Sequence, residues 1–391
     1  MCSLDVVIAG AGPAGSLAAI ILARAGARVR LVDRAAFPRD KLCGDTINPG
    51  AVAILRRFGL QRELHARGLP INGMIVTGPM GVQVRGRYAE RRGLTQGFAL
   101  RRRDLDAALV DAAVDAGVQF EERVTVRGPI VDDDGGRPRV RGVTVRGHNG
   151  RPVKLSAAVT IAADGRRSVV ATVLALARAT VRPRRWVVGG YFGGVTGLSS
   201  FGEMHVRADY YIGVTAVPGG LANVCVVSAV RSRFARPEAL LRDAVGTDPQ
   251  LGSRFAGAVL TERPVSIGPM GVDARAAGLP GLLLAGDAAG FIDPMTGDGV
   301  RFALRGGELA GQTALWMLKT GRPDGYRRLG QRRALEFAGK LRFNRGVRAL
   351  VGSPLGVQAG ALGAAVAPWV LRRVIAYAGD VDLGGATPAR V

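Results

Sequence analysis

Short apolar runs alternate with helix-forming segments in the first third of the chain. The apolar run at 5–9 is followed by helix-forming residues that end at Gly26, and a second apolar run occupies 28–33. Residues 101–120 repeat this order of helix, glycine stop and strand. Strands that alternate with helices in this way predict a parallel sheet covered by helices.

The hydrophobic pattern changes further along the chain. Residues 123–156 alternate apolar and polar positions around turn-rich breaks, which predicts an antiparallel set of strands that ends in a buried strand. Residues 186–266 combine strand periodicity with glycine turns and one helix. Residues 281–290 return to a buried strand followed by a helix, and the chain from 326 onward is predicted to be helical.

These elements predict an α/β fold with a doubly wound, Rossmann-like domain, an inserted β-rich domain and a C-terminal helical region. The doubly wound domain is expected to be discontinuous, with the segments 1–75, 96–175 and 268–325. The β-rich domain is expected to take 76–95 and 176–267, and the C-terminal helices 326–391.

Composition narrows the class of protein without indicating its activity. With 391 residues, 48% of them hydrophobic, the chain can bury a sizeable core, which excludes a disordered protein. The formal charge of +23 raises the question of nucleic-acid binding. The arginines are scattered, however, and no zinc-finger spacing or RNA-binding signature accompanies them. We therefore expect no nucleic-acid partner, whereas a negatively charged substrate or membrane surface stays open.

Three features bear on localisation. The three cysteines lie far apart and form no metal-ligand pattern, which is typical of a reducing compartment. The chain enters a strand almost at once, so a secretory leader is not expected. Pro368 and the pair Arg372–Arg373 interrupt the most apolar late stretch, which argues against a transmembrane helix. We expect a cytoplasmic protein whose C-terminal region packs in the core, covers an apolar pocket or rests on a membrane surface.

A glycine cluster directly follows the first predicted strand and opens the first helix. Its spacing, GAGPAG at 10–15, permits a tight turn and close approach of the backbone to a pyrophosphate at the helix N-terminus. Asp33 ends the second strand, where a carboxylate can accept hydrogen bonds from an adenosine ribose. The sequence therefore predicts a dinucleotide site. Its expected residues are Gly10, Gly12, Pro13, Ala14, Gly15, Asp33 and Arg34.

Four further motifs indicate which dinucleotide binds. They are FPRDKLCGDTINP at 37–49, LRRRDLDAAL at 100–109, AADGRRSVV at 162–170 and GDAAGFIDPMTGDGV at 286–300. In this order and at these intervals, they make the chain resemble the flavoprotein superfamily of single-component aromatic hydroxylases (group A flavin monooxygenases) and geranylgeranyl reductases. The resemblance covers about the first 320 residues. It implies FAD as the cofactor and NAD(P)H as the electron donor.

The resemblance also implies roles for individual residues. Arg102 matches the family arginine that approaches the cofactor diphosphate. Asp164 and Gly165 match an element that serves the pyrophosphate region and NAD(P)H contact. Gly286 and Asp287 match the element whose aspartate binds the ribityl hydroxyls of FAD. The residues implied to line the flavin ring are Pro294, Gly297, Asp298 and Gly299.

The details favour one branch of the superfamily. The segment FPRDKLCGD, and Gly290 where many aromatic hydroxylases carry histidine, resemble geranylgeranyl reductases and flavin halogenases. The aromatic–Trp–Phe–Pro element of the reductases is missing, however, and so is the Trp-x-Trp-x-Ile-Pro element of the halogenases. Cys43, next to Gly44, occupies the position where the branch places a cysteine near the flavin. It is either part of the active site or a buried apolar residue.

We expect an FAD-dependent, NAD(P)H-driven oxidoreductase that acts on a hydrophobic small molecule. No acid–base pair is evident, since His65, His148 and His205 are isolated in the sequence. Because the reductase element is missing, hydroxylation of an aromatic or polyketide-like substrate is favoured. The alternatives are reduction of isoprenoid double bonds and a non-catalytic carrier of the same fold. The sequence leaves the substrate and the oligomeric state open.

Overall fold

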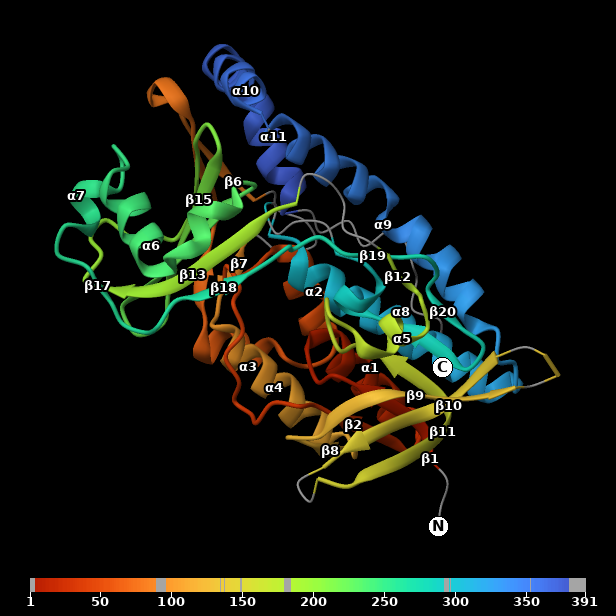
Figure 1. Cartoon of the computed structure of the whole chain (residues 1–391). Helices are drawn as coiled ribbons and strands as arrows, with labels where there is room; N and C mark the ends of the chain where they lie inside the picture. The colour runs from red at the N-terminus through yellow and green to blue at the C-terminus, as the bar shows by residue number, and fades with distance from the viewer. Residues whose placement is uncertain are drawn as a thin grey trace.

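The computed structural model describes residues 4–88, 96–133, 135–136, 138–147, 150–178, 184–291, 295, 297–351 and 353–379. The structure contains two large sheets, one in the lower part of the view in Figure 1 and the other at its left. The first sheet has the order β20 (Gly278–Leu279), β21 (Leu282–Leu284), β11 (Pro152–Ala162), β1 (Leu4–Ala9), β2 (Val29–Val32) and β8 (Gln119–Glu121).

The centre of the first sheet is parallel, as the sequence pattern predicts. β1 pairs in parallel with both β2 and β11, and β11 pairs in parallel with β21. The strands β9 (Thr125–Asp133) and β10 (Pro138–Arg146) continue antiparallel from β11, which confirms the predicted antiparallel set. Val6, Val7 and Ile8 on β1 are fully buried, because helices cover one face of the sheet and β9 and β10 approach the other.

The helices α1 (Pro13–Arg24), α4 (Arg102–Asp115) and α8 (Gly299–Thr320) pack on the first sheet. The crossing of α1 and α8 is close because α8 carries glycine there. A Cβ atom at Gly307 would clash with the carbonyl oxygen of Ala14, and one at Gly311 would lie 3.2 Å from that of Ala18. The contact therefore holds the first turns of α1 against the middle of α8.

The second sheet forms the β-rich part of the molecule. Its order is β17 (Val259–Leu260), β13 (Trp186–Gly193), β16 (Leu221–Ser228), β15 (Tyr210–Val217), β14 (Gly202–Val206), β5 (Gly73–Thr77) and β6 (Gln83–Arg87), and β18 (Val265–Ile267) pairs with β13. One face packs against α6 (Pro237–Gly246) and α7 (Gly252–Phe255). The other face carries Val187, Tyr211 and Val227, which belong to a separate apolar cluster. The domain boundaries drawn from the sequence stay a prediction, although β5 enters this sheet at Gly73.

Smaller elements join the two sheets. The strands β3 (Thr46–Ile47), β7 (Gly97–Ala99) and β4 (Leu69–Ile71) form a three-stranded sheet, and β12 (Ala177–Arg178) pairs with β19 (Asp273–Ala274). The short helices are α2 (Pro49–Arg57), α3 (Gln61–Arg67), α5 (Val169–Val173), η1 (Pro79–Gly81), η2 (Arg231–Ala235) and η3 (Gly286–Ala289).

Three helices end the described chain: α9 (Gly325–Leu350), α10 (Pro354–Val366) and α11 (Pro368–Ala378). α9 runs along one side of the molecule, and α10 and α11 lie beyond the second sheet (Figure 1). α11 packs on β6, where a Cβ atom at Gly86 would lie 2.7 Å from Cδ1 of Ile375. Within the described residues, no single helix has the length and apolar character needed to cross a bilayer, while α9 and 355–366 pass that test together as a bent pair.

Candidate active site

One large cavity lies between the two sheets and the C-terminal helices. Its volume is about 1270 Å³, whereas pockets for drug-sized ligands enclose roughly 300–1,000 Å³. Its lining comes from the loop after β1, the segment 39–48, the start of α4, the turn at 163–167, η3, the second sheet and α9 to α11. The cavity therefore joins segments that are far apart in the sequence, and it has room for more than one ligand.

The loop between β1 and α1 permits close approach to its backbone. Gly10 has a φ of 99°, and a Cβ atom there would clash with the carbonyl oxygen of Ala163. Gly12 lines the cavity, and a Cβ atom at this position would lie 3.3 Å from Nη2 of Arg39. Because α1 begins at Pro13, the unpaired N–H groups of its first turn lie beside this loop and are available to an anionic ligand.

Gly15 has a different role from the two glycines before it. It is not among the residues that line the cavity, and a Cβ atom there would clash with the carbonyl oxygen of Gly10. Its missing side chain lets α1 pack closely against the end of β1, which is the packing role of the last glycine in this spacing. Ala14 follows the cavity-lining Pro13 and also lines the cavity.

Asp33 is fixed at the end of β2. Its Oδ2 accepts a hydrogen bond from the N–H of Ala11 at 2.8 Å, and its Oδ1 accepts one from the N–H of Ala35 at 2.9 Å. The residue is buried, and both Asp33 and Arg34 line the cavity. The two hydrogen bonds hold the carboxylate beside the glycine loop, where the sequence predicts a ribose contact.

Basic side chains bring positive charge to the same end of the cavity. Nη2 of Arg39 lies 3.1 Å from Oδ2 of Asp106, and Arg102 donates to Oδ1 of the same buried carboxylate at 2.8 and 3.0 Å. Nζ of Lys41 lies 4.0 Å from Oδ2 of Asp287, and burial lowers the pKa of Lys41. Arg102 was predicted as a site residue, whereas Arg39 and Lys41 were not, although the segment FPRDK contains both.

Gly286 and Asp287 lie on the same cavity as the glycine loop. Gly286 has a φ of 58°, and a Cβ atom there would lie 2.9 Å from the Cβ of Ala14. Both residues line the cavity together with Gly12. The structure thus brings together two glycine clusters that are 274 residues apart in the sequence (286 − 12).

Asp164 and Gly165 continue the lining after β11. Oδ2 of Asp164 accepts a hydrogen bond from the N–H of Val169 at 2.9 Å. Its Oδ1 is buried and has no hydrogen-bond partner within the described part of the chain, and burial raises the pKa of this carboxyl group. Nε of Arg39 is likewise buried without a partner among the described residues. A ligand in the cavity could provide the missing partners.

The turn before α8 presents its glycines to the cavity. Gly297 and Gly299 line it, whereas the buried Asp298 is not among the lining residues. Oδ1 of Asp298 accepts a hydrogen bond from Nδ2 of Asn48 at 2.9 Å and lies 3.6 Å from Nζ of Lys340. The Asp298 side chain therefore braces the turn, a role that the sequence analysis did not foresee. Pro294 lies outside the described residues.

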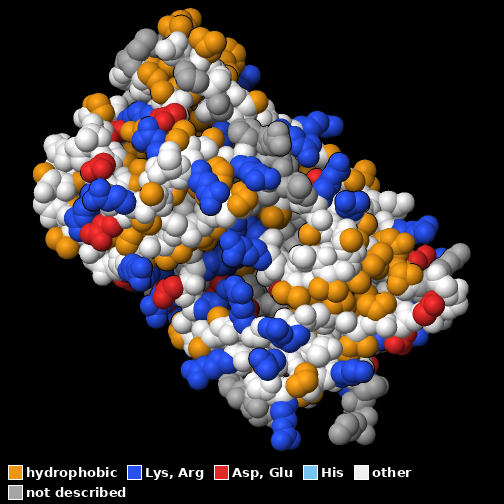
Figure 2. Space-filling view, in the orientation of Figure 1, with side chains coloured by type: hydrophobic (Ala, Val, Ile, Leu, Met, Phe, Trp, Pro, Cys, Tyr) orange, Lys and Arg blue, Asp and Glu red, His pale blue; other side chains and the backbone are white. Residues whose placement is uncertain are grey.

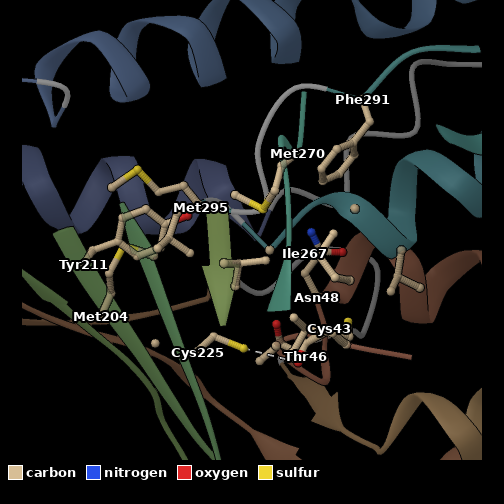
Figure 3. A pocket seen from close by; sticks show the side chains of 18 of the residues that line it. Cys43, Thr46, Asn48, Met204, Tyr211, Cys225, Ile267, Met270, Phe291 and Met295 are labelled. Atoms are coloured by element: carbon tan, nitrogen blue, oxygen red, sulfur yellow. Dashed lines mark hydrogen bonds between the residues drawn. The ribbon is translucent and has the colours of Figure 1, made fainter. Parts of the chain in front are cut away.

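Two cysteines from distant segments meet in the cavity (Figure 3). Sγ of Cys225 donates a weak hydrogen bond to the carbonyl oxygen of Cys43 at 3.5 Å. Both cysteines and Gly44 line the cavity. Burial raises the pKa of both thiols, so they stay protonated at neutral pH. The sequence analysis named Cys43 but gave Cys225 no role.

Asp45 is buried next to this pair of cysteines. Its Oδ2 accepts hydrogen bonds from Oη of Tyr191 at 2.7 Å and from Nδ2 of Asn223 at 2.8 Å. Its Oδ1 accepts a hydrogen bond from the N–H of Arg102 at 3.1 Å. Burial raises the pKa of Asp45 to about 6. The sequence analysis missed this residue, because only the folded chain brings the second sheet to the segment 43–45.

The part of the cavity between the second sheet and the C-terminal helices is apolar, and we call it the apolar lobe. Figure 3 shows Met204, Tyr211 and Cys225 on the strands of the second sheet, facing Met270 and Met295. Further apolar lining from the second sheet, β18, the turn before α8 and the helices consists of Met74, Val76, Val187, Val206, Val227, Ile267, Phe291, Phe343, Val347, Val351, Val357, Ala361, Ala364, Leu371, Val374 and Ile375. The lobe suits a hydrocarbon ligand.

Neither of the two histidines in the described part of the chain lines the cavity. His205 is buried, with Nδ1 at 2.9 Å from Oγ1 of Thr77 and Nε2 at 3.1 Å from Oε2 of Glu203. It is therefore a satisfied core histidine, although it is not isolated in the fold. His65 is exposed, and His148 lies outside the described residues.

Comparison with known protein families gives a match along most of the chain. A family model described as an FAD binding domain matches residues 3–307. A menaquinone reductase from Mycolicibacterium smegmatis is 31% identical over 318 residues, which are 79% of this chain and 75% of that protein. Conditioned medium factor receptor 1 from Dictyostelium discoideum is 29% identical over 78% of this chain, which spans 62% of the receptor's length.

Solved structures with the same fold come from different kinds of flavoprotein. The flavin-dependent brominase Bmp2 matches with a TM-score of 0.83 and 18% identity, over 96% of this chain and 94% of that one. A geranylgeranyl bacteriochlorophyll reductase-like protein from Thermoplasma acidophilum matches with a TM-score of 0.78 and 23% identity, over 91% and 89%. At these identities the likeness concerns the fold.

Proposed function

We propose a reaction for this chain, which belongs to the family of FAD-binding-domain flavoproteins and is an FAD-dependent oxidoreductase. We infer that it reduces carbon–carbon double bonds in a long, apolar, isoprenoid-like molecule. The apolar lobe is the observation that carries this inference, because it lies on the same cavity as the glycine loop and reaches the C-terminal helices. The names of the menaquinone reductase and of the reductase-like structure support the same choice.

The residues on the cavity fit FAD. The glycine loop leaves space for a pyrophosphate, and the buried Oδ1 of Asp164 and Nε of Arg39 lack partners among the described residues. We propose that Asp33 holds the adenosine ribose, that Arg39 lies at the diphosphate, and that Asp287 accepts hydrogen bonds from the ribityl hydroxyls. When bound and reduced by its electron donor, FAD would supply the two electrons of the reaction as a hydride.

The apolar lobe selects its ligand mainly by excluding water. Its walls offer mainly methyl, thioether and aromatic surface, and the second sheet adds the polar lining residues Thr77, Glu203, Thr215 and Asn223. Each methylene that moves from water into such a site contributes about 0.8 kcal/mol. A long hydrocarbon chain therefore gains affinity with length until it fills the lobe. A small polar phenol would leave most of this surface uncovered.

Reduction of a double bond also needs a proton, and we propose Cys43 as its source. Cys43 lines the cavity next to Thr46 and Asn48 (Figure 3), and its carbonyl oxygen is 3.5 Å from Sγ of Cys225 on the second sheet. Its thiol carries a proton at neutral pH because burial raises its pKa. In the proposed step, one carbon of the double bond accepts the hydride and the other accepts the proton. The thiolate then regains a proton from solvent.

We propose NAD(P)H as the electron donor. Arg166 and Arg167 line the cavity next to Gly165 and carry charge suited to the donor's phosphates. Nη1 of Arg166 donates to the carbonyl oxygen of Pro269 at 3.1 Å, which holds the guanidinium group on the cavity wall. Anaerobic mixing of the FAD-loaded protein with NADH or NADPH tests the donor, since either one should bleach the flavin absorbance.

Hydroxylation is the second candidate, and the missing aromatic–Trp–Phe–Pro element favours it. Turnover with a polyprenyl substrate in the presence and absence of oxygen separates the two reactions. A reductase consumes NAD(P)H anaerobically in step with substrate, and the product gains two hydrogen atoms for each double bond. Oxygen-dependent turnover with an added oxygen atom in the product would instead establish hydroxylation.

A further inference from the structure

Helix α10 is apolar around its whole circumference but is not enclosed by the protein. Gln358 is the one polar side chain of the helix after its N-terminal cap. Val357, Ala361 and Ala364 are buried on its inner side, whereas Leu355 is 78% exposed and Val366 is 86% exposed. A helix that is apolar on all sides is normally buried in a core or in a membrane. The outer side of α10 therefore lacks the polar residues of an ordinary surface helix.

The exposed apolar surface continues onto α11. Trp369 is 56% exposed, and Leu362 and Val370 are exposed as well. We call the surface formed by Leu355, Leu362, Val366, Trp369 and Val370 the apolar cap. Figure 2 shows hydrophobic side chains gathered over this end of the molecule, at the top of the view around α10. Adjacent apolar side chains of this size usually mark a contact surface.

The charge next to the apolar cap has one sign. Residues 337–379 contain no aspartate or glutamate. Their exposed basic residues are Arg342, Arg345, Arg372 and Arg373, whereas Lys340 and Arg348 are buried. The guanidinium carbon of Arg373 lies 5.2 Å from the ring centroid of Trp369, so charge and aromatic surface lie side by side. Arginine next to exposed tryptophan and leucine on a short helix is the pattern of a segment that lies in the interface of a bilayer.

The apolar cap is also the outer side of the wall that encloses the apolar lobe. Ala361, Ala364 and Leu371 line the lobe from within, and Val370 both lines the cavity and is 44% exposed. The apolar cap and the apolar lobe therefore lie on opposite sides of the wall that α10 and α11 form.

We propose that the apolar cap docks on the surface of an anionic lipid bilayer, with Arg372 and Arg373 at the headgroups. The basic surroundings favour anionic lipid over a second copy of this chain, because two caps facing each other would bring like charges together. This inference rests on the cap and its charge, and it holds for any reaction in the cavity.

Sedimentation with vesicles tests the proposal. The FAD-loaded full chain should bind vesicles of phosphatidylcholine with phosphatidylglycerol, and bind vesicles of phosphatidylcholine alone less strongly. Leu362→Glu with Val366→Glu should abolish binding, because charged groups oppose entry into the acyl region. Arg372→Gln and Arg373→Gln should each lower the partition coefficient for anionic vesicles about fivefold, since one arginine near the surface contributes about 1 kcal/mol.

Leu335→Glu provides the matched control, because Leu335 is an exposed leucine on α9, 15 residues before the end of that helix (350 − 335). This variant should bind vesicles like the parent chain. Normal flavin occupancy in every variant shows that folding is preserved. The proposal is overturned if the parent chain stays in the supernatant at low salt, or if the double variant in α10 still sediments with vesicles. A dimer that dissociates on Leu362→Glu would assign the cap to self-association instead.

Discussion

A substitution at Asp287 tests cofactor binding separately from folding, because this side chain is not part of the hydrophobic core. Its side chain is partly exposed on the cavity wall, and its nearest cation, Lys41 Nζ, is 4.0 Å away. We predict that Asp287→Ala leaves the protein folded and weakens FAD binding by about tenfold or more, because hydrogen bonds to a charged group contribute roughly 1.5–3 kcal/mol. Fluorescence titration of the apoprotein with FAD measures this change.

Asp111→Ala is the control for this prediction, since Asp111 is exposed on α4. It should bind FAD as the parent chain does. If Asp287→Ala kept the parent affinity, the assigned ribityl contact would be wrong, and the cofactor would have to be placed by the glycine loop and Asp33.

Asp45 gives a prediction about pH. Burial raises the pKa of its carboxyl group from 3.8 to about 6, so the folded chain binds this proton more tightly than the unfolded chain does. The free energy of unfolding should therefore fall as the pH rises from about 4 to about 7, by at most about 3 kcal/mol for a shift of roughly two units. Asp45→Asn should remove this part of the pH dependence.

Urea unfolding of the parent chain and of Asp45→Asn, at pH 4 and pH 7 with FAD in excess, measures the difference. Asp111→Asn at an exposed position should follow the parent chain at both pH values. Equal slopes for the parent and Asp45→Asn would show that the buried carboxyl group titrates normally in the folded protein.

At the scale of elements, Lys340 connects the end of α11 to the turn before α8. Its Nζ donates to the carbonyl oxygens of Tyr377 at 2.5 Å and Ala378 at 3.1 Å, and it lies 3.6 Å from Oδ1 of Asp298. Loss of one partner of a buried ion pair costs about 3–5 kcal/mol. We predict that Lys340→Met destabilises the protein and speeds amide exchange in α11 more than in α1.

Arg342→Met tests the specificity of this effect, because Arg342 is exposed on the same helix. Its exchange pattern should match that of the parent chain. Unchanged exchange in α11 of Lys340→Met would mean that packing on β6, around Ile375, is sufficient to hold the helix.

Hydrophobic runs and glycine spacing predict single helices and strands, but they do not predict which distant segments pair. The parallel strands around the glycine loop follow from hydrophobic runs and glycine spacing, and the structure contains them at Leu4–Ala9 and Val29–Val32. The parallel pairing of β14 with β5 joins residues more than 120 positions apart, and no periodicity encodes it. Cys225 and Asp45 were not predicted as site residues for the same reason, because only contacts between distant segments bring them to the cavity. α10 was predicted as a helix, but its all-round apolar character could not show which side lines the cavity.

At the scale of the whole molecule, one cavity links β1, η3 and the second sheet. A ligand that binds only the folded state at 100 times its dissociation constant adds about 2.7 kcal/mol to stability. We predict that saturating FAD slows amide exchange in both the loop at 10–15 and η3, because both lie on the same cavity. Exchange measured with and without FAD checks this, and protection of only one of these segments would contradict a shared site.

The tight crossing of α1 and α8 has a consequence for how the protein is made. Ala14 and Gly307 touch, yet 293 residues separate them (307 − 14), so the first helix leaves the ribosome long before its partner exists. At 5–20 residues per second, that interval is roughly 15–60 s. Throughout it, the face of α1 that packs on α8 lacks its partner, although β1, β2 and α4, which also contact α1, have already been made. The newborn chain should therefore depend on chaperones until translation has passed α8.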